Sequence, residues 1–218
     1  MSSSTLNERS ALRDRAQKRG LGARLTWLHL VSRQVPAALA IMAGLAVVLN
    51  IGARLNWYSG DGALVQQVPV LLEAGAVVVI AVSTRSPFGE VELANGRLLP
   101  GLRLGTVLAL TAAAIGLMAA GMIGVHLPDG GAALARNMAG MTGIGLITAT
   151  ILGGAMAWVG PVAYAAITEY ALSASWQSPL IWAARPPHDG GAVLCAAAVF
   201  VVGVVLIAVR GPRNTVRE

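Results

Sequence analysis

The stretch NMAGMTGIGLITATILGGAMAWVGPVAYAAITEYAL, residues 137–172, decides how many times this chain can cross a bilayer. It has no long polar break and is far longer than the roughly 20 residues that one membrane-spanning helix needs. Gly153 and Gly154 near its centre predict a tight turn. We expect two helices, 137–152 and 155–172; the alternative is one helix followed by a re-entrant or interfacial segment.

The composition of the whole chain also indicates a membrane protein. Of its residues, 56% are hydrophobic and only 12% are charged, whereas an ordinary globular domain has about 25% charged residues. Four other apolar runs are long enough to span, so we expect an all-α integral membrane protein with six transmembrane helices. The expected spans are residues 36–52, 64–83, 104–126, 137–152, 155–172 and 192–209 within one domain, 36–209.

Basic residues predict which side of the membrane each loop faces, because cytoplasmic loops carry an excess of Lys and Arg. With six spans and both termini cytoplasmic, 13 of the 16 basic residues fall inside. An arrangement with five spans would place the basic tail, 210–218, on the outer side and would weaken the excess of basic residues inside. The three that fall outside are Arg54, Arg136 and Arg185.

The N-terminal segment, residues 1–35, is basic and partly amphipathic. Leu21, Leu25, Leu28 and Val31 recur at helical spacing among arginines. A helix lying on the inner leaflet buries such leucines and places its arginines near anionic lipid. A solvated basic tail is the alternative for its first part.

The sequence contains few residues in patterns typical of catalysis, nucleotide binding or metal binding. It has no phosphate-binding loop ending in Gly-Lys-Ser or Gly-Lys-Thr, and Lys18 is its single lysine. His29, His126 and His188 are far apart, which argues against a metal site. No nucleophile with a base is evident, and the basic residues form no nucleic-acid-binding module. We therefore expect no enzyme, no cofactor or metal in this chain, and no nucleic-acid partner.

Glu73 is the sharpest candidate residue inside a span. It lies about nine residues, or roughly 14 Å of helix, into the second span. An ionised group is costly in hydrocarbon, so it is expected to face the bundle interior. In one hypothesis, Glu73 lines a translocation path together with Gln66 and Gln67, or binds a cationic or proton-coupled group. In the other it is a protonated acid, hydrogen-bonded between helices for packing.

The loop at residues 84–103 is long for a connection between two spans. Glu90 and Glu92 precede Leu93, and residues 89–99 can form a short amphipathic helix bounded by Pro100 and Gly101. Such a helix can rest on the membrane or insert into a cytoplasmic partner. A plain solvated loop, whose acids balance nearby arginines, is the alternative.

Glu90, Glu92-Leu93, Pro100 and Leu104-Gly105 resemble the loop between spans two and three in the permease subunits of six-helix ABC exporters. In that family the loop is a coupling helix that binds a separate ATPase subunit. The resemblance implies that Glu90, Glu92, Leu93 and Pro100 contact this ATPase, which holds the ATP and Mg²⁺. Thr106 stands where the family usually has a basic residue.

Two other parts of the chain resemble this family in layout. The N-terminal amphipathic stretch resembles its connecting helix, and residues 176–185 resemble its short outer re-entrant element. The resemblance implies a multi-pass permease of a bacterial cell membrane, paired with a second copy or a homologous chain. The alternative from another class is a non-transporting scaffold, immunity or assembly protein that recruits a partner through the same loop.

Overall fold

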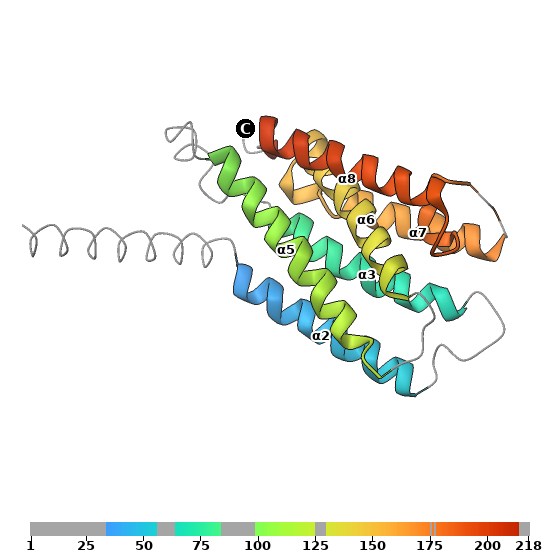
Figure 1. Ribbon diagram of the computed structural model, residues 1–218. Coiled ribbons are helices and arrows are strands. Elements are labelled where there is room, and N and C mark those ends of the chain that lie inside the picture. The colour runs from blue at the N-terminus through green and yellow to red at the C-terminus, as the bar shows by residue number, and fades with distance from the viewer. Residues whose placement is uncertain are drawn as a thin grey trace, which may run out of the picture.

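The computed structural model describes residues 34–55, 64–83, 99–124, 130–174, 176 and 178–213, and within this part it contains helices and no strands (Figure 1). Two short 3-10 helices, η1 and η2, lie between longer α-helices. The elements are α2 (Val35–Arg54), α3 (Leu64–Ser83), α5 (Leu99–Gly121), α6 (Gly130–Leu152), η1 (Gly154–Met156), α7 (Val159–Ser173), η2 (Trp182–Ala184) and α8 (Gly190–Arg210).

Successive α-helices run in alternating directions, so their ends gather at two opposite ends of one bundle (Figure 1). The first, called here the terminal end, contains the start of α2, the end of α3, the start of α5 and the end of α8. There the Arg213 amide donates to the Ala149 carbonyl over 3.2 Å. At the opposite end, Asn50 Nδ2 donates to the Gly121 carbonyl over 2.8 Å and so joins the ends of α2 and α5. Gln34 and Arg213, the two limits of the described chain, thus lie at the same end.

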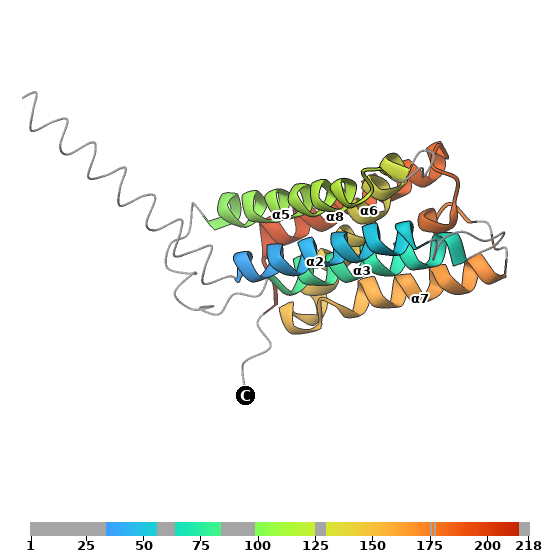
Figure 2. The same ribbon diagram turned by 90° about the horizontal axis from the view of Figure 1, so that it is seen from below.

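The bundle has α5, α6 and α8 along one side and α2, α3 and α7 along the other (Figure 2). α6 is its central helix and packs against α3, α5, α7 and α8. Glycines allow these close approaches. A Cβ at Gly143 would lie 2.5 Å from the Val199 carbonyl oxygen of α8, and one at Gly203 would lie 2.5 Å from the Gly143 carbonyl oxygen. The backbones of α6 and α8 therefore cross in direct contact, as small residues at helix interfaces permit.

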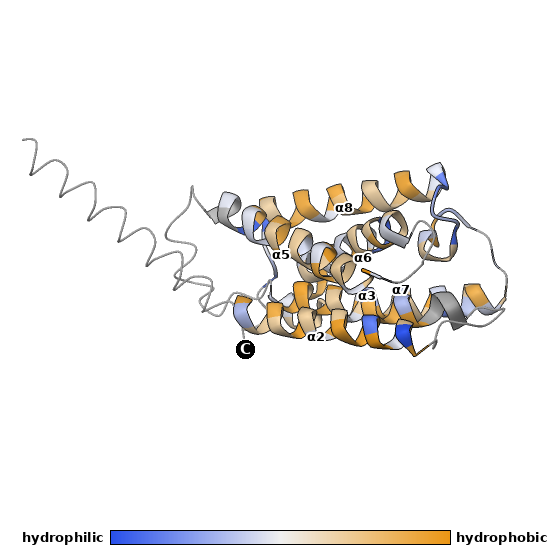
Figure 3. Ribbon diagram, turned by 60° about the horizontal axis from the view of Figure 1, so that its bottom comes forward, coloured by the Kyte–Doolittle hydropathy of each residue, from blue (hydrophilic) through white to orange (hydrophobic). Residues whose placement is uncertain are grey.

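The helices consist largely of apolar residues (Figure 3), and many of these side chains are exposed on the outside of the bundle. Ile41 of α2, Leu71 of α3 and Val201 of α8 are each more than half exposed. Three helical segments are long and apolar enough to cross a membrane, namely Val35–Arg54, Arg103–Gly121 and Gly190–Arg210. An apolar exterior of this extent suits lipid rather than water. The fold is that of an all-helical membrane protein with three candidate spanning helices.

Several predicted boundaries agree with the helices. The predicted break at Gly153 and Gly154 is confirmed: α6 ends at Leu152, and Gly153 has a φ of 93°, a conformation that favours glycine. The second predicted span, 64–83, coincides with α3. The first and last predicted spans agree with α2 and α8 to within two residues at each end.

Three other boundaries were wrong. The third span was expected at 104–126; its start agrees with the candidate span Arg103–Gly121, but the helix ends at Gly121. α5 itself begins at Leu99 and includes Pro100 and Gly101, which were expected to separate it from the loop helix. Proline is tolerated in a first helical turn, where its missing N–H has no partner to lose. α6 begins at Gly130 rather than at 137, so Arg136, which was expected outside the span, lies within the helix. α7 begins at Val159 rather than at 155, after the turn through η1.

The segment 1–35 was predicted to contain an amphipathic helix, and its residues 1–33 lie outside the described residues. So does the loop between Ser83 and Leu99, and so does the tail after Arg213.

Candidate functional site: a buried polar chain

Glu73 lies near the middle of α3 and is only 4% exposed. Its hydrogen-bond partner is the side chain of Asn137 on the facing helix α6, and Arg136 is the positive charge that acts on it. Its Oε2 atom has no hydrogen-bond partner among the described residues. A buried acid in an apolar bundle needs such partners, because an unpaired charge is costly there. The expectation that Glu73 faces the interior agrees with this placement.

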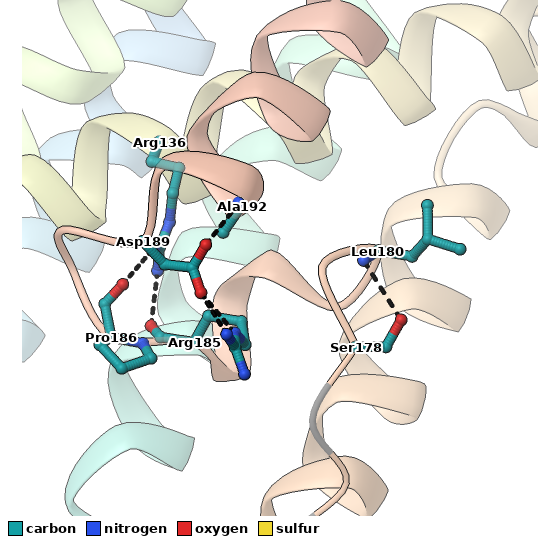
Figure 4. A network of polar contacts seen from close by, with 7 residues as sticks. All are labelled: Arg136, Ser178, Leu180, Arg185, Pro186, Asp189 and Ala192. Atoms are coloured by element: carbon teal, nitrogen blue, oxygen red, sulfur yellow. Dashed lines mark hydrogen bonds and ion pairs between the residues drawn. The ribbon is translucent and has the colours of Figure 1, made fainter.

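Arg136 contacts a second part of the chain, the segment before α8 (Figure 4). Its Nε donates to Asn137 Oδ1 over 3.2 Å, which leaves the amide nitrogen of Asn137 to donate to the Glu73 carboxylate. Its Nη1 donates to the Pro186 carbonyl over 2.7 Å and its Nη2 to the Arg185 carbonyl over 3.0 Å. The guanidinium thus uses its planar fork to hold two successive carbonyl groups.

The carbonyl groups belong to residues 178–189, called here the folded-back segment, which precedes α8 and returns into the bundle. Trp182 in this segment is 2% exposed and stacks on Tyr164 of α7, with ring centroids 4.4 Å apart. Gly140 of α6 makes room for it, since a Cβ there would lie 2.5 Å from the indole ring. The Tyr164 hydroxyl accepts from the Ala183 amide over 3.3 Å and donates to the Leu180 carbonyl over 3.4 Å.

Asp189 ends the folded-back segment and caps α8. Its Oδ1 accepts from the Ala192 amide over 3.0 Å, and its Oδ2 accepts from Arg185 Nε over 2.7 Å (Figure 4). The Ala192 amide, followed by the hydrogen bond and charge of Arg185, lowers the pKa of Asp189 below its ordinary value. An acid at this position is stabilising because the first amides of a helix have no partner within the helix.

Asp189→Ala is expected to lower the melting temperature by a few degrees at neutral pH, because α8 loses its cap. Since the folded-state pKa of Asp189 is lowered, its contribution is complete above the ordinary pKa of about 4 and disappears as the pH falls through the lower value. Thermal unfolding of both proteins in mild detergent, between pH 7 and pH 3, checks this. A difference that stayed constant down to the lowest pH would rule out an ionised cap.

The structure brings together residues that were not predicted. Arg136 was expected to be a charge of an outer loop that reports topology only; it lies instead inside α6 and is 6% exposed. Asn137, Tyr164 and Trp182 carried no predicted role. The Arg-Asn pair beside an apolar run was the one available signal, since charged residues at such places usually have buried partners.

The other predicted site residues fall on parts of the chain whose side chains the structure does not describe. Gln66 and Gln67 lie in the first turn of α3, but their side chains are outside the described part of the structure, as is the side chain of Pro100 in α5. Glu90, Glu92 and Leu93 also lie outside the described residues. Within the described ranges, no group of three or more His, Cys, Asp or Glu side chains is placed to hold a metal ion.

The fold and this site define the class of the protein: an all-helical membrane protein with a buried polar chain between α3, α6 and the segment before α8. A comparison with models of protein families finds none that matches, and neither a curated protein nor a solved structure matches the chain.

Proposed function

We propose that this chain is the transmembrane permease subunit of an ATP-driven ABC exporter in a bacterial cell membrane. It crosses the membrane six times and works with a separate ATPase subunit that binds and hydrolyses ATP with Mg²⁺. It performs no hydrolysis itself. A second copy, or a homologous chain, completes the translocation path.

The observation that carries this proposal is the layout of the helices. Both limits of the described chain, together with the residues that flank the loop between α3 and α5, lie at the terminal end. The folded-back segment lies at the opposite end. A permease of the family that the loop resembles needs the same arrangement, because its coupling loop faces the ATPase and its re-entrant element faces outward.

The described arginines support the same orientation. Arg103, Arg210 and Arg213 belong to the terminal end. Arg54 and Arg185 lie at the opposite end, where Arg136 is buried. In the sequence, the ten other basic residues precede α2, lie between α3 and α5 or follow Arg213. By the positive-inside rule, this distribution supports a cytoplasmic terminal end.

Six spans require α3, α6 and α7 to cross as well. α6 has polar residues such as Arg136, Asn137 and Thr142, but it is the central helix and these side chains are buried within the bundle. A helix enclosed by its neighbours does not need an apolar surface all round, so its composition is compatible with a span. α7 is short, and the turn through η1 extends it toward the terminal end.

Association with the ATPase tests the proposal. The tagged protein is purified from its native host in mild detergent, and the proteins that remain bound are identified by mass spectrometry. We expect a stoichiometric ATPase with the wild type. We expect its loss from the triple variant Glu90→Gln, Glu92→Gln and Leu93→Ala, because the acids and the leucine supply the charged and apolar contacts of the coupling loop.

Glu169→Gln is the matched control. It also removes an acid, but Glu169 lies near the C-terminus of α7, at the opposite end of the bundle. It is expected to retain the ATPase. Full ATPase association in the triple variant would contradict the coupling role of the loop. If no ATPase is found even after gentle cross-linking, the exporter proposal fails and a scaffold or assembly protein becomes the better description.

A further inference from the structure

Three arginines from different segments gather around Gly211 at the terminal end, where the start of α5 lies beside the end of α8 (Figure 1). Gly211 follows Arg210, the last residue of α8, and has a φ of 71°, a conformation that favours glycine. Arg103 of α5 fills the space next to it: a Cβ at Gly211 would overlap Arg103 Nη1 and lie 3.0 Å from its Cζ. The guanidinium of Arg103 thus lies beside the chain between Arg210 and Arg213. These three residues are called here the arginine cluster.

Arg213 holds the chain after Gly211 against the end of α6. Its amide donates to the Ala149 carbonyl over 3.2 Å, and its Nη1 donates to the Ile151 carbonyl over 3.4 Å. The last carbonyl groups of a helix attract positive charge, so this position suits an arginine. A guanidinium has five N–H donors, so the bond to Ile151 leaves donors for a further acceptor. The cluster is therefore positioned by the packed ends of α5, α6 and α8.

The described residues place no acid beside the arginine cluster. The acids that they include are Glu73 near the middle of α3, and Glu169 and Asp189 at the opposite end of the bundle. Like charges gathered in one place repel one another, and an anion bound among them removes this repulsion. Arginine suits phosphate in particular, because its planar fork donates two parallel hydrogen bonds to two oxygens.

An exposed apolar surface adjoins the cluster. Val209 directly precedes Arg210 and is 78% exposed, and Val205, one turn earlier, is 52% exposed. Both belong to α8, which is long and apolar enough to cross a membrane. At the end of such a helix, exposed valines face hydrocarbon, and the arginine that follows them lies at the level of the lipid headgroups. Cationic and apolar groups thus adjoin here, as they must in order to bind an anionic amphiphile.

We infer that the arginine cluster binds the headgroup phosphate of an anionic phospholipid, whose acyl chains lie along Val205 and Val209. Attraction between basic residues at a membrane border and anionic headgroups supports this occupant. The bound lipid joins the ends of α5, α6 and α8 in one leaflet. The inference is independent of the permease proposal and of any ATPase, since it requires only that α8 crosses a bilayer.

Quenching of a fluorophore beside the cluster tests this inference on the purified full-length protein in nonionic detergent. The free Cys195 is replaced by alanine, and a bimane is attached to a Val209→Cys reporter. Phosphatidylglycerol with brominated acyl chains is titrated into the micelles, and phosphatidylcholine with the same chains is the neutral comparison. A Leu55→Cys reporter, at a residue that is 60% exposed and follows α2, measures lipid contact at the opposite end.

We expect phosphatidylglycerol to quench the Val209→Cys reporter half-maximally at a mole fraction about tenfold lower than phosphatidylcholine requires, because several arginines attract the anionic headgroup. Arg210→Gln is expected to raise the mole fraction of phosphatidylglycerol about fivefold, the effect of one arginine near an anionic surface, and to leave the response to phosphatidylcholine unchanged. Arg210 is exposed, so this substitution preserves the packing of the bundle. Arg54→Gln, which removes an exposed arginine at the opposite end, is the matched control and is expected to change neither response.

Equal quenching of the Val209→Cys reporter by the two lipids would overturn the inference, and is the result expected if an acid of the loop between α3 and α5 occupies the cluster. An unchanged response to phosphatidylglycerol in Arg210→Gln would also overturn it. The same preference at Leu55→Cys, or the same loss in Arg54→Gln, would do so as well, because it would indicate general attraction to a basic protein. If inorganic phosphate at the concentration of the lipid abolishes the preference, the cluster binds a free anion and the lipid assignment fails.

Discussion

Gly143→Val is expected to lower the free energy of unfolding by about 3 kcal/mol, at the upper end of the usual cost of overpacking. A Cβ at Gly143 would lie 2.5 Å from the Val199 carbonyl oxygen and 2.6 Å from the Phe200 Cα. Both atoms belong to the backbone of α8, which cannot turn aside as a flexible side chain can. The two helices would have to separate, and α6 packs against α8 along much of the bundle. Unfolding in mild detergent, followed by helix content, measures the loss.

Gly116→Val is the matched control for this prediction. Gly116 is also a helical glycine, on α5, but a Cβ there would meet nothing within 4 Å. It is expected to change the stability by less than about 0.5 kcal/mol, as most exposed substitutions do. Similar stability of the two variants would mean that α6 and α8 do not cross in direct backbone contact.

Arg136→Met is expected to destabilise the folded protein by about 1–3 kcal/mol, the usual cost of leaving buried hydrogen-bond acceptors without their donor. The substitution removes the donor that Asn137 Oδ1 accepts from. It also leaves the carbonyl groups of Arg185 and Pro186 without their donors. The measurement is again unfolding in mild detergent, at neutral pH.

The double variant Glu73→Gln and Arg136→Met is expected to be about as unstable as Arg136→Met, because both variants lose the contacts to the two carbonyl groups. Arg54→Met, which removes an exposed arginine, is expected to have little effect. A double variant much more stable than Arg136→Met would show that the loss arises from an uncompensated charge and not from the carbonyl contacts. Wild-type stability of the single variant would show that Arg136 is not held in the interior.

The candidate site could be predicted only in part. Glu73 stood out because an acid within an apolar run has few tolerable positions other than the interior of a bundle. Its partners could not be recognised, because Asn137 and Arg136 are more than 60 positions away and belong to a helix whose predicted start excluded Arg136. Pairing across α3 and α6 depends on how far each helix is rotated and shifted against the other, and hydropathy contains no such information.

The sequence by itself determined the helical membrane class, the break at Gly153 and the limits of α3, because these depend on local composition and backbone freedom. The tertiary structure alone decided which polar groups meet and where the segment before α8 lies. Trp182 and Arg136 read as ordinary residues of a membrane border, yet both are buried, one against Tyr164 and Gly140 and the other between two carbonyl groups and Asn137. A buried polar group is stable only where other elements bring its partners, so its role is a property of the packed bundle and not of its neighbours in the chain.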